Sequence, residues 1–271
     1  MRFKTAIATL LSVLCLQASA NTVVVHIFNF DFGSVPPTHS DPVIEAGDTV
    51  RWILDTGVHS SKSAAGQAES WDSTIMTVGG STYDHTFTNV GTFNYFCQLH
   101  GFDLGGGQVG GMSGKVIVAN TYHPTAFTLF RGKLVSGGVP ELQNSDDQYL
   151  IVGRGLVANI QEATIQVDFT TTVPTMNPSV LAVSLEDGSN AAGLTRRIFV
   201  LNVQTNQLEQ VNQSSLTIAD KLTVVQLTGD LSRFVNQTTG VVKVRVAYPQ
   251  LGPVSIFGYQ AKFDRLAILS D

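Results

Sequence analysis

After its first twenty residues, the sequence has no long segment in which apolar residues recur with the 3.6-residue period of an α-helix. This absence is the feature that most constrains the fold. Short segments rich in Val, Ile, Thr, Phe and Tyr recur instead, separated by turns of Gly, Asp, Pro and Ser. Many short strands at regular spacing are typical of β-sandwiches and barrels, so we predict an all-β protein. The strand candidates of the first half are Thr22–Phe30, Val43–Ile44, Thr49–Leu54, Thr82–Phe87, Gly91–Cys97 and Gly114–Val118.

The second half repeats this style. Eight further strand candidates lie within residues 127–268, and they predict a second antiparallel β-sandwich. The strand pattern stops at Val118 and resumes near Ala126. We therefore expect one domain over residues 21–120 and a second, of unknown ligand, over residues 121–271.

Residues 1–20 have the pattern of a secretory signal peptide. A basic start with Arg2 and Lys4 precedes an apolar run that ends at Leu16, and the small residues Ala18-Ser19-Ala20 follow. The apolar run is too short to cross a hydrocarbon layer of roughly 30 Å. We expect this segment to be cleaved and the mature chain to be exported, to the periplasm or the extracellular space, without a transmembrane anchor.

Charge is sparse and uneven. The formal net charge is −5, and the predicted domain at residues 21–120 holds nine Asp and Glu against three Lys and Arg. Residues 121–271 hold twelve acidic and eleven basic residues, close to neutrality. Nucleic acid is excluded as a partner because phosphate binding needs a basic face. A protein partner with a basic docking face suits the acidic first half.

The cysteine count is the most informative part of the composition. The chain has only Cys15 and Cys97, and Cys15 lies in the predicted signal. An exported protein with one remaining cysteine has no internal disulfide. Cys97 is then either a small buried apolar residue or a ligand.

The segment around Cys97 favours the ligand. On a strand, side chains alternate, so Phe93, Tyr95 and Cys97 share the core-facing side. His100 follows three residues later, where it can turn back toward the sulfur. Met112 precedes the next strand and is expected at the same end of the domain.

A second imidazole is expected from His59, which follows the strand Thr49–Leu54. A thiolate, two imidazoles and a distant thioether suit copper that cycles between Cu(I) and Cu(II). Gln98 and Gln108 stay open as alternative axial ligands, and Ser60 is a candidate hydrogen-bond donor to the thiolate.

Residues 23–118 resemble the plastocyanin-like cupredoxins. The resemblance lies in the run from Phe93 to His100 (aromatic-x-Tyr-x-Cys-x-x-His), the later Met112-Ser113-Gly114 and the earlier His59. It implies a Greek-key β-sandwich, electron transfer between redox partners and one type 1 copper held by His59, Cys97, His100 and, axially, Met112. Residues 101–111 depart from the family pattern, and we interpret them as a lengthened ligand loop.

Residues 124–271 show a looser resemblance to accessory β-sandwich domains of bacterial exported proteins, carried by the segments Arg131–Gly138 and Ser145–Leu150. This resemblance implies no particular ligand. An adhesive or carbohydrate-binding role through this half is therefore an alternative function, and a copper storage, sensing or delivery module is another.

The remaining residues argue against an enzyme. A dinuclear copper site needs a second Cys. Multicopper oxidases and copper nitrite reductases need further His ligands, one of them commonly beside the Cys, and in this sequence Phe96 occupies that position. We interpret Met76 as a packing residue and expect His85 to face solvent. The other histidines are expected to be structural or at the surface: His26, His39 and His123. The leading hypothesis is an electron carrier whose partner is a small redox protein or a membrane or periplasmic electron-transfer complex.

Overall fold

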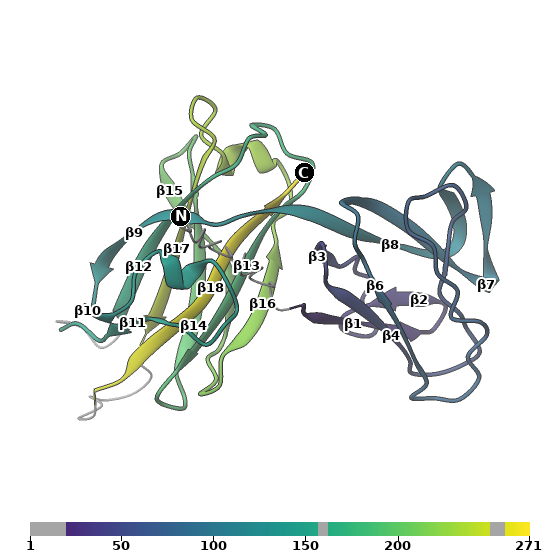
Figure 1. Ribbon diagram of the computed structural model, residues 1–271, viewed down its shortest axis with the longest axis horizontal. Helices are drawn as coiled ribbons and strands as arrows, with labels where there is room; N and C mark the ends of the chain where they lie inside the picture. Colours follow the sequence, from purple (N-terminus) through teal and green to yellow (C-terminus); the bar gives the residue numbers. More distant parts are fainter. Residues whose placement is uncertain (1–19, 157–161, 250–257) are drawn as a thin grey trace, which may run out of the picture.

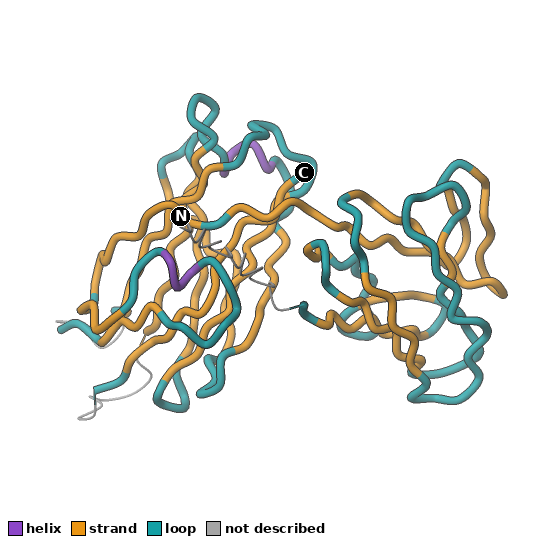
Figure 2. The backbone as a smooth tube through the Cα atoms, viewed as in Figure 1, coloured by secondary structure: helices purple, strands orange, loops and turns teal. Residues whose placement is uncertain are grey.

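The computed structural model describes residues 20–156, 162–249 and 258–271, so all but the last residue of the predicted signal peptide lies outside the described ranges. The described chain forms two lobes built almost entirely of strands (Figures 1 and 2). The predicted all-β class is therefore confirmed. Within the described ranges the helical elements are two short 3₁₀ turns, Pro140–Leu142 and Leu231–Phe234, and no helix has the length and apolar character to cross a bilayer.

The first lobe begins with a four-stranded sheet in the order β2-β1-β4-β6, in which β1 and β4 run parallel. The predicted first strand, residues 22–30, is shorter than expected because the chain turns at Asn29-Phe30 and returns as β2. The strands are β1 (Thr22–Phe28), β2 (Asp31–Gly33), β4 (Thr49–Leu54) and β6 (Thr82–Thr86).

The facing sheet of this lobe is dominated by two long antiparallel strands, β7 (Gly91–Gly105) and β8 (Gln108–Tyr122). Two short strands flank them, β5 (Lys62–Ser63) beside β7 and β3 (Val43–Glu45) parallel to β8. The strand that was expected to end at Val118 continues to Tyr122, because its last residues pair with a strand of the second lobe.

The second lobe is an antiparallel β-sandwich, as predicted. One sheet has the order β15-β14-β17-β12-β9, and the other places β18 between β11 and β13, with all pairings antiparallel. The strands are β9 (Pro124–Arg131), β10 (Lys133–Ser136), β11 (Leu150–Gly153), β12 (Ala163–Thr172), β13 (Leu181–Ser189), β14 (Thr195–Asn202), β15 (Gln207–Ser215), β16 (Lys221–Gln226), β17 (Val241–Pro249) and β18 (Gln260–Ser270).

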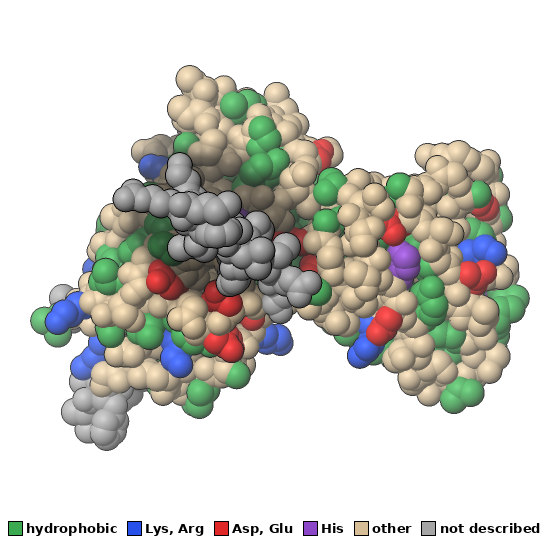
Figure 3. Space-filling view, viewed as in Figure 1, with side chains coloured by type: hydrophobic (Ala, Val, Ile, Leu, Met, Phe, Trp, Pro, Cys, Tyr) green, Lys and Arg blue, Asp and Glu red, His purple; other side chains and the backbone are tan. Residues whose placement is uncertain are grey.

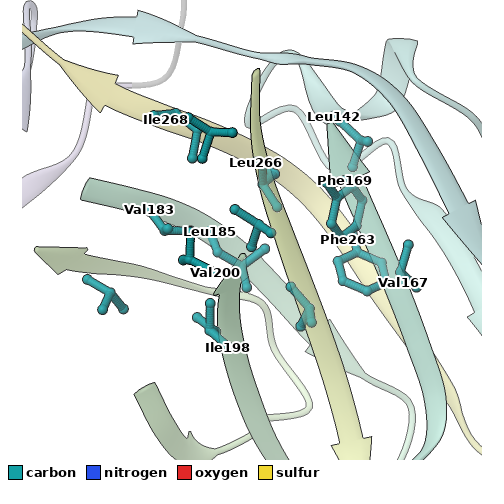
Figure 4. Packing of buried hydrophobic residues seen from close by; sticks show 14 of the residues in the cluster. Leu142, Val167, Phe169, Val183, Leu185, Ile198, Val200, Phe263, Leu266 and Ile268 are labelled. Carbon is teal, nitrogen blue, oxygen red and sulfur yellow. The ribbon is translucent and has the colours of Figure 1, made fainter. Parts of the chain in front are cut away.

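Each lobe has its own buried core. The alternating side chains Val50, Trp52 and Leu54 of β4 are fully buried in the first lobe. In the second lobe, side chains from opposite sheets meet in the core, such as Phe169 of β12 and Phe263 of β18, whose ring centroids are 5.3 Å apart (Figure 4). The side chains of the two sheets thus close each sandwich independently.

A third, smaller apolar cluster joins the lobes at the narrower waist seen in Figure 3. It unites residues of β3 and β8 with residues of β13 and β18: Val43, Ile117, Ala119, Ala182, Ala267 and Leu269. Beside it, the buried Arg265 of β18 forms an ion pair with Glu45 of β3. The division of the chain at residues 120 and 121 stays a prediction, and β8 crosses it without a break.

His85 does not face solvent as expected. Its side chain is 19% exposed, stacks on Trp71 at a ring-centroid distance of 5.2 Å and contacts the carboxylate of Glu69. The sequence pattern placed His85 on one face of β6, but the alternation of a strand does not tell which face is the core. Pairing with β4 turns this face inward.

Glu69 is a buried carboxylate with an unusually complete set of donors. Burial alone would raise its pKa, but the Asn89 side chain, the backbone N–H groups of Thr88 and Asn89, and His85 all stabilise the charged form. Together they lower the pKa of Glu69 from 4.5 to about 2. The unfolded chain therefore takes up a proton between pH 4.5 and 2 that the folded chain does not.

We expect the unfolding free energy of the first lobe to fall by about 3 kcal/mol from this group as pH drops through that window. Both tryptophans, Trp52 and Trp71, lie in this lobe, so urea titrations followed by tryptophan fluorescence report on it selectively. Glu69→Gln should remove this part of the pH dependence. Asp84→Asn, in a half-exposed pair with Arg51, should change it little; equal pH dependence in wild type and Glu69→Gln would contradict the assignment.

Candidate metal centre

Strand β7 delivers the cysteine to the interior as predicted. Phe93, Tyr95 and Cys97 are all buried, with Cys97 at 0% exposure, because alternate side chains of β7 face the core. The structure thus places the sulfur at the end of an aromatic row, out of contact with water.

The segment interpreted as a lengthened loop is instead a continuation of the β7–β8 ladder. Phe96 pairs with Ser113, and pairing resumes with Gly101 opposite Gly111. Four residues of β7, Cys97 to His100, are therefore opposed by one residue of β8, Met112. This bulge turns His100 back toward the sulfur, and Met112 lies opposite the bulge in the ladder.

The hairpin beyond the bulge is tied to the first lobe. The carboxylate of Asp103 accepts a hydrogen bond of 2.7 Å from the backbone N–H of Ala65. The N–H of Gly107 donates to the carbonyl of Ala65, and the Asn94 side chain donates to the carbonyl of Gly107. These contacts hold a Gly-rich segment as a strand pair although glycine has low strand propensity.

His59 reaches the same place from the turn after β4. It is 3% exposed, and its backbone exchanges two hydrogen bonds with Met76. Gly57 lies two residues before it with φ of +83°, and a β-carbon at Gly57 would be 2.8 Å from His59 Nε2. The imidazole therefore fits only because this position is glycine.

Three ligand-type atoms meet at this point. Cys97 Sγ lies 3.4 Å from His100 Nδ1 and 3.7 Å from His59 Nδ1, and the two nitrogens are 3.1 Å apart. These atoms are close enough together to hold one metal ion. The structure thus brings together His59, Cys97 and His100, three of the four predicted site residues, through their potential donor atoms.

The fourth predicted residue, Met112, is buried in the same apolar cluster as Cys97. Met76, which was interpreted as a packing residue, belongs to this cluster too. The alternatives lie elsewhere: the Gln98 side chain donates to Asp72, and Gln108 stands at the exposed tip of the hairpin. Two methionines therefore belong to the apolar cluster that holds the cysteine.

Ser60 supports the sulfur through its backbone rather than its hydroxyl. Its N–H lies 3.4 Å from Cys97 Sγ, and its hydroxyl accepts a hydrogen bond from the N–H of Gln98. A single buried residue therefore positions both the sulfur and the start of the bulge.

The electrostatics favour neutral imidazole at His59. Burial lowers the pKa of His59, and the neighbouring His100 adds to this shift. Neutral imidazole is the form that binds metals.

The other histidines have partners outside this site. His26 contacts Asp55, His39 contacts Asp31, and His123 contacts the carbonyl of Leu266. Together with His85, they lie apart from the Cys97 sulfur, as expected.

Phe30 was not anticipated from the sequence. It is the second residue of the turn between β1 and β2, and its ring meets His100 at 4.6 Å and His59 at 5.5 Å between centroids, edge-on in both cases. The preceding residue, Asn29, was the one sequence signal of the turn, since Asn is favoured at the first of the two central positions of a two-residue hairpin turn.

A second group of potential ligands lies in the other lobe and differs in chemistry. Carboxylate oxygens of Asp147, Asp220 and Asp264 lie within 4.8 Å of one another, and the Tyr149 hydroxyl is within hydrogen-bond distance of the first two. This group has only hard oxygen atoms and no sulfur or imidazole.

No family model matches the chain. Among solved structures, it is similar to an oxidised amicyanin variant at 28% identity over 36% of this chain and 81% of amicyanin, with a TM-score of 0.28. It is also similar to a Cu(I) form of another amicyanin variant, at 27% identity over 38% of this chain and 86% of that one, with a TM-score of 0.28. A copper-containing nitrite reductase from Thermus scotoductus SA-01 matches at 22% identity over 36% of this chain and 22% of the reductase, with a TM-score of 0.29. The functional conclusion therefore rests on the donor atoms and their geometry.

Gly57→Ala should lower affinity for Cu(II) at least tenfold, because the new methyl group displaces the His59 ring. Gly80→Ala is a matched control, since Gly80 has nearly the same φ, +85°, but open space around its β-carbon position. Each variant carries a left-handed backbone cost of about 1 to 2 kcal/mol. Titration of both with Cu(II) separates the two effects, and equal losses of affinity would refute the steric role of Gly57.

Proposed function

We propose that the first lobe binds one copper ion through His59 Nδ1, Cys97 Sγ and His100 Nδ1 and carries single electrons between redox partners. The observation that carries this proposal is the triangle of one sulfur and two imidazole nitrogens, with edges of 3.1, 3.4 and 3.7 Å. A His₂Cys set with a nearby methionine is the donor set of electron-transfer copper sites. Bound copper would supply a centre that exchanges one electron between Cu(I) and Cu(II).

The protein residues contribute rigidity and exclusion of water. Cys97 and His59 are buried, and the Ser60 N–H points at the sulfur. His59 is anchored through its backbone to Met76, while Cys97 and His100 are anchored by the bulge in the β7–β8 ladder. Because both of these segments fix the ligands, the geometry of the site changes little between redox states. The reorganisation energy of electron transfer is therefore small.

Met112 is the axial ligand in this proposal. It stands opposite the bulge that carries Cys97 and His100, and it is buried with the sulfur. Met76 shares the cluster, but its backbone hydrogen bonds already give it a positioning role beside His59.

His100 reaches the surface, so its ring would be the ligand nearest to a docked partner. The surrounding domain, residues 21–120, carries nine acidic and three basic residues. We infer a partner with a basic docking face, either a small redox protein or an electron-transfer complex in or at a membrane. Export to the periplasm or the extracellular space is part of this proposal.

The principal alternative is a copper storage, sensing or delivery module, which needs a site open to ligand exchange. The burial of His59 and Cys97 favours the electron carrier instead. Enzymatic copper chemistry with additional metal ions would need further imidazoles, and the other histidines of the described ranges are engaged elsewhere. An adhesive or carbohydrate-binding role of the second lobe is compatible with either function.

One equivalent of Cu(II) should give an intense visible charge-transfer band and narrow copper hyperfine splitting in the EPR spectrum, because a buried thiolate donates to the metal. Cys97→Ala should abolish both signals. A pale spectrum of ordinary tetragonal copper that is indifferent to Cys97→Ala would refute the proposal.

Substitution of each methionine identifies the axial ligand. Met112→Gln should change the ratio of the charge-transfer bands and lower the reduction potential, because an amide oxygen stabilises Cu(II) more than a thioether does. Met76→Leu is the matched control and should leave the band ratio unchanged. The reverse pattern would assign the axial position to Met76.

Electron exchange and copper release separate the carrier from the delivery module. We expect the Cu(I) protein to reduce a small basic redox protein rapidly, at a rate that falls as salt screens the acidic lobe. Loss of copper to a soluble chelator should be slow by comparison. Slow electron exchange combined with rapid copper loss would favour delivery.

A further inference from the structure

Phe30 occupies a position where its residue type is unfavourable. The turn between β1 and β2 has two residues, and both have positive φ, 39° at Asn29 and 64° at Phe30. This combination defines a type I′ turn, whose second residue is most often glycine. A bulky side chain with positive φ is a conformational outlier.

Core packing does not explain the choice of phenylalanine. Phe30 is 65% exposed, whereas Phe32, two residues later in β2, is fully buried. A large apolar side chain that is both exposed and on strained backbone gains little from folding itself, so its contacts point to a role at the site.

The contacts of the Phe30 ring are with the two imidazoles. The interplanar angles are 86° with His100 and 90° with His59, and the His100 contact is the closer. The fully buried Cys97 sulfur lies next to the Nδ1 atoms of the same two imidazoles. Phe30 and part of His100 are therefore exposed, whereas His59 and the sulfur are buried.

We propose that the Phe30 ring is a lid over the imidazole pair, which holds His100 against the sulfur and keeps water and small external ligands away from the Nδ1–Sγ triangle. This inference rests on the proposed function, because a closed site suits an electron carrier and an open one suits copper delivery. Phe30 is a positioning residue: it acts through His59 and His100.

The lid can be tested without copper, because Cys97 is the one thiol after residue 20. In the metal-free protein, Phe30→Gly should increase the rate at which the disulfide reagent dithiobis(nitrobenzoate) reacts with Cys97 at least tenfold. The same variant should keep or raise the urea midpoint, because glycine relieves the positive φ. A faster reaction in an equally stable protein reports local opening rather than unfolding.

Three further variants complete the comparison. Phe30→Asn also tolerates the left-handed turn while removing the ring, and it should react like Phe30→Gly. Phe30→Tyr keeps an aromatic ring and should restore the slow rate. Phe102→Ala removes another exposed aromatic, 55% exposed on the β7–β8 hairpin, and should leave the rate unchanged.

Addition of azide to the Cu(II)-loaded proteins supplies the second readout. The wild-type spectrum should be unaffected, whereas Phe30→Gly should develop a new ligand-to-copper band. If the stable Phe30→Gly and Phe30→Asn proteins react with the disulfide reagent at the wild-type rate, the lid is overturned. A loss of stability in both variants would also overturn it. If the Cu(II)-loaded wild-type protein lacks the thiolate-to-copper charge-transfer band, the proposed electron transfer by copper is overturned instead. The measurement of thiol reactivity in the metal-free protein would still decide whether Phe30 is a lid.

Discussion

The antiparallel ladder between β7 and β8 is the constraint on which the rest of the structure depends. Its regular pairing carries Cys97 into the core, and its one strong irregularity sets four residues against Met112. The same strand β8 then leaves the first lobe and pairs with β18 of the second. One ladder therefore positions Cys97, His100 and Met112 and also joins the two lobes.

The site combines burial with local strain. His59 fits against the chain because Gly57 has no side chain, and Phe30 covers the imidazoles at the cost of an unfavourable backbone conformation. Such departures from local preference are common where a structure must hold reactive groups in one arrangement. Hydrogen bonds from Ala65 and Asn94 hold the β7–β8 hairpin that extends beyond the site.

Features governed by local periodicity were predictable. The period-two alternation of Phe93, Tyr95 and Cys97 follows from strand geometry, and His100 follows from its spacing. The extension of the ladder through residues 101–111 was not predictable, because glycines contribute little strand propensity and tertiary hydrogen bonds hold that segment. His85 was placed on the wrong side for a related reason: alternation defines two faces without saying which one is buried.

By itself the sequence determined the all-β class, the donor types and the strand that carries the cysteine, because these depend on residue chemistry and on neighbours a few positions apart. Only the tertiary structure decided which distant groups meet. His59 lies 38 residues before Cys97 in the chain, and its approach depends on the pairing of β4 with β1 and β6. Phe30 reaches the imidazoles through a turn that the strand pattern concealed. Such contacts depend on sheet register and turn geometry, which arise from the packing of the whole lobe.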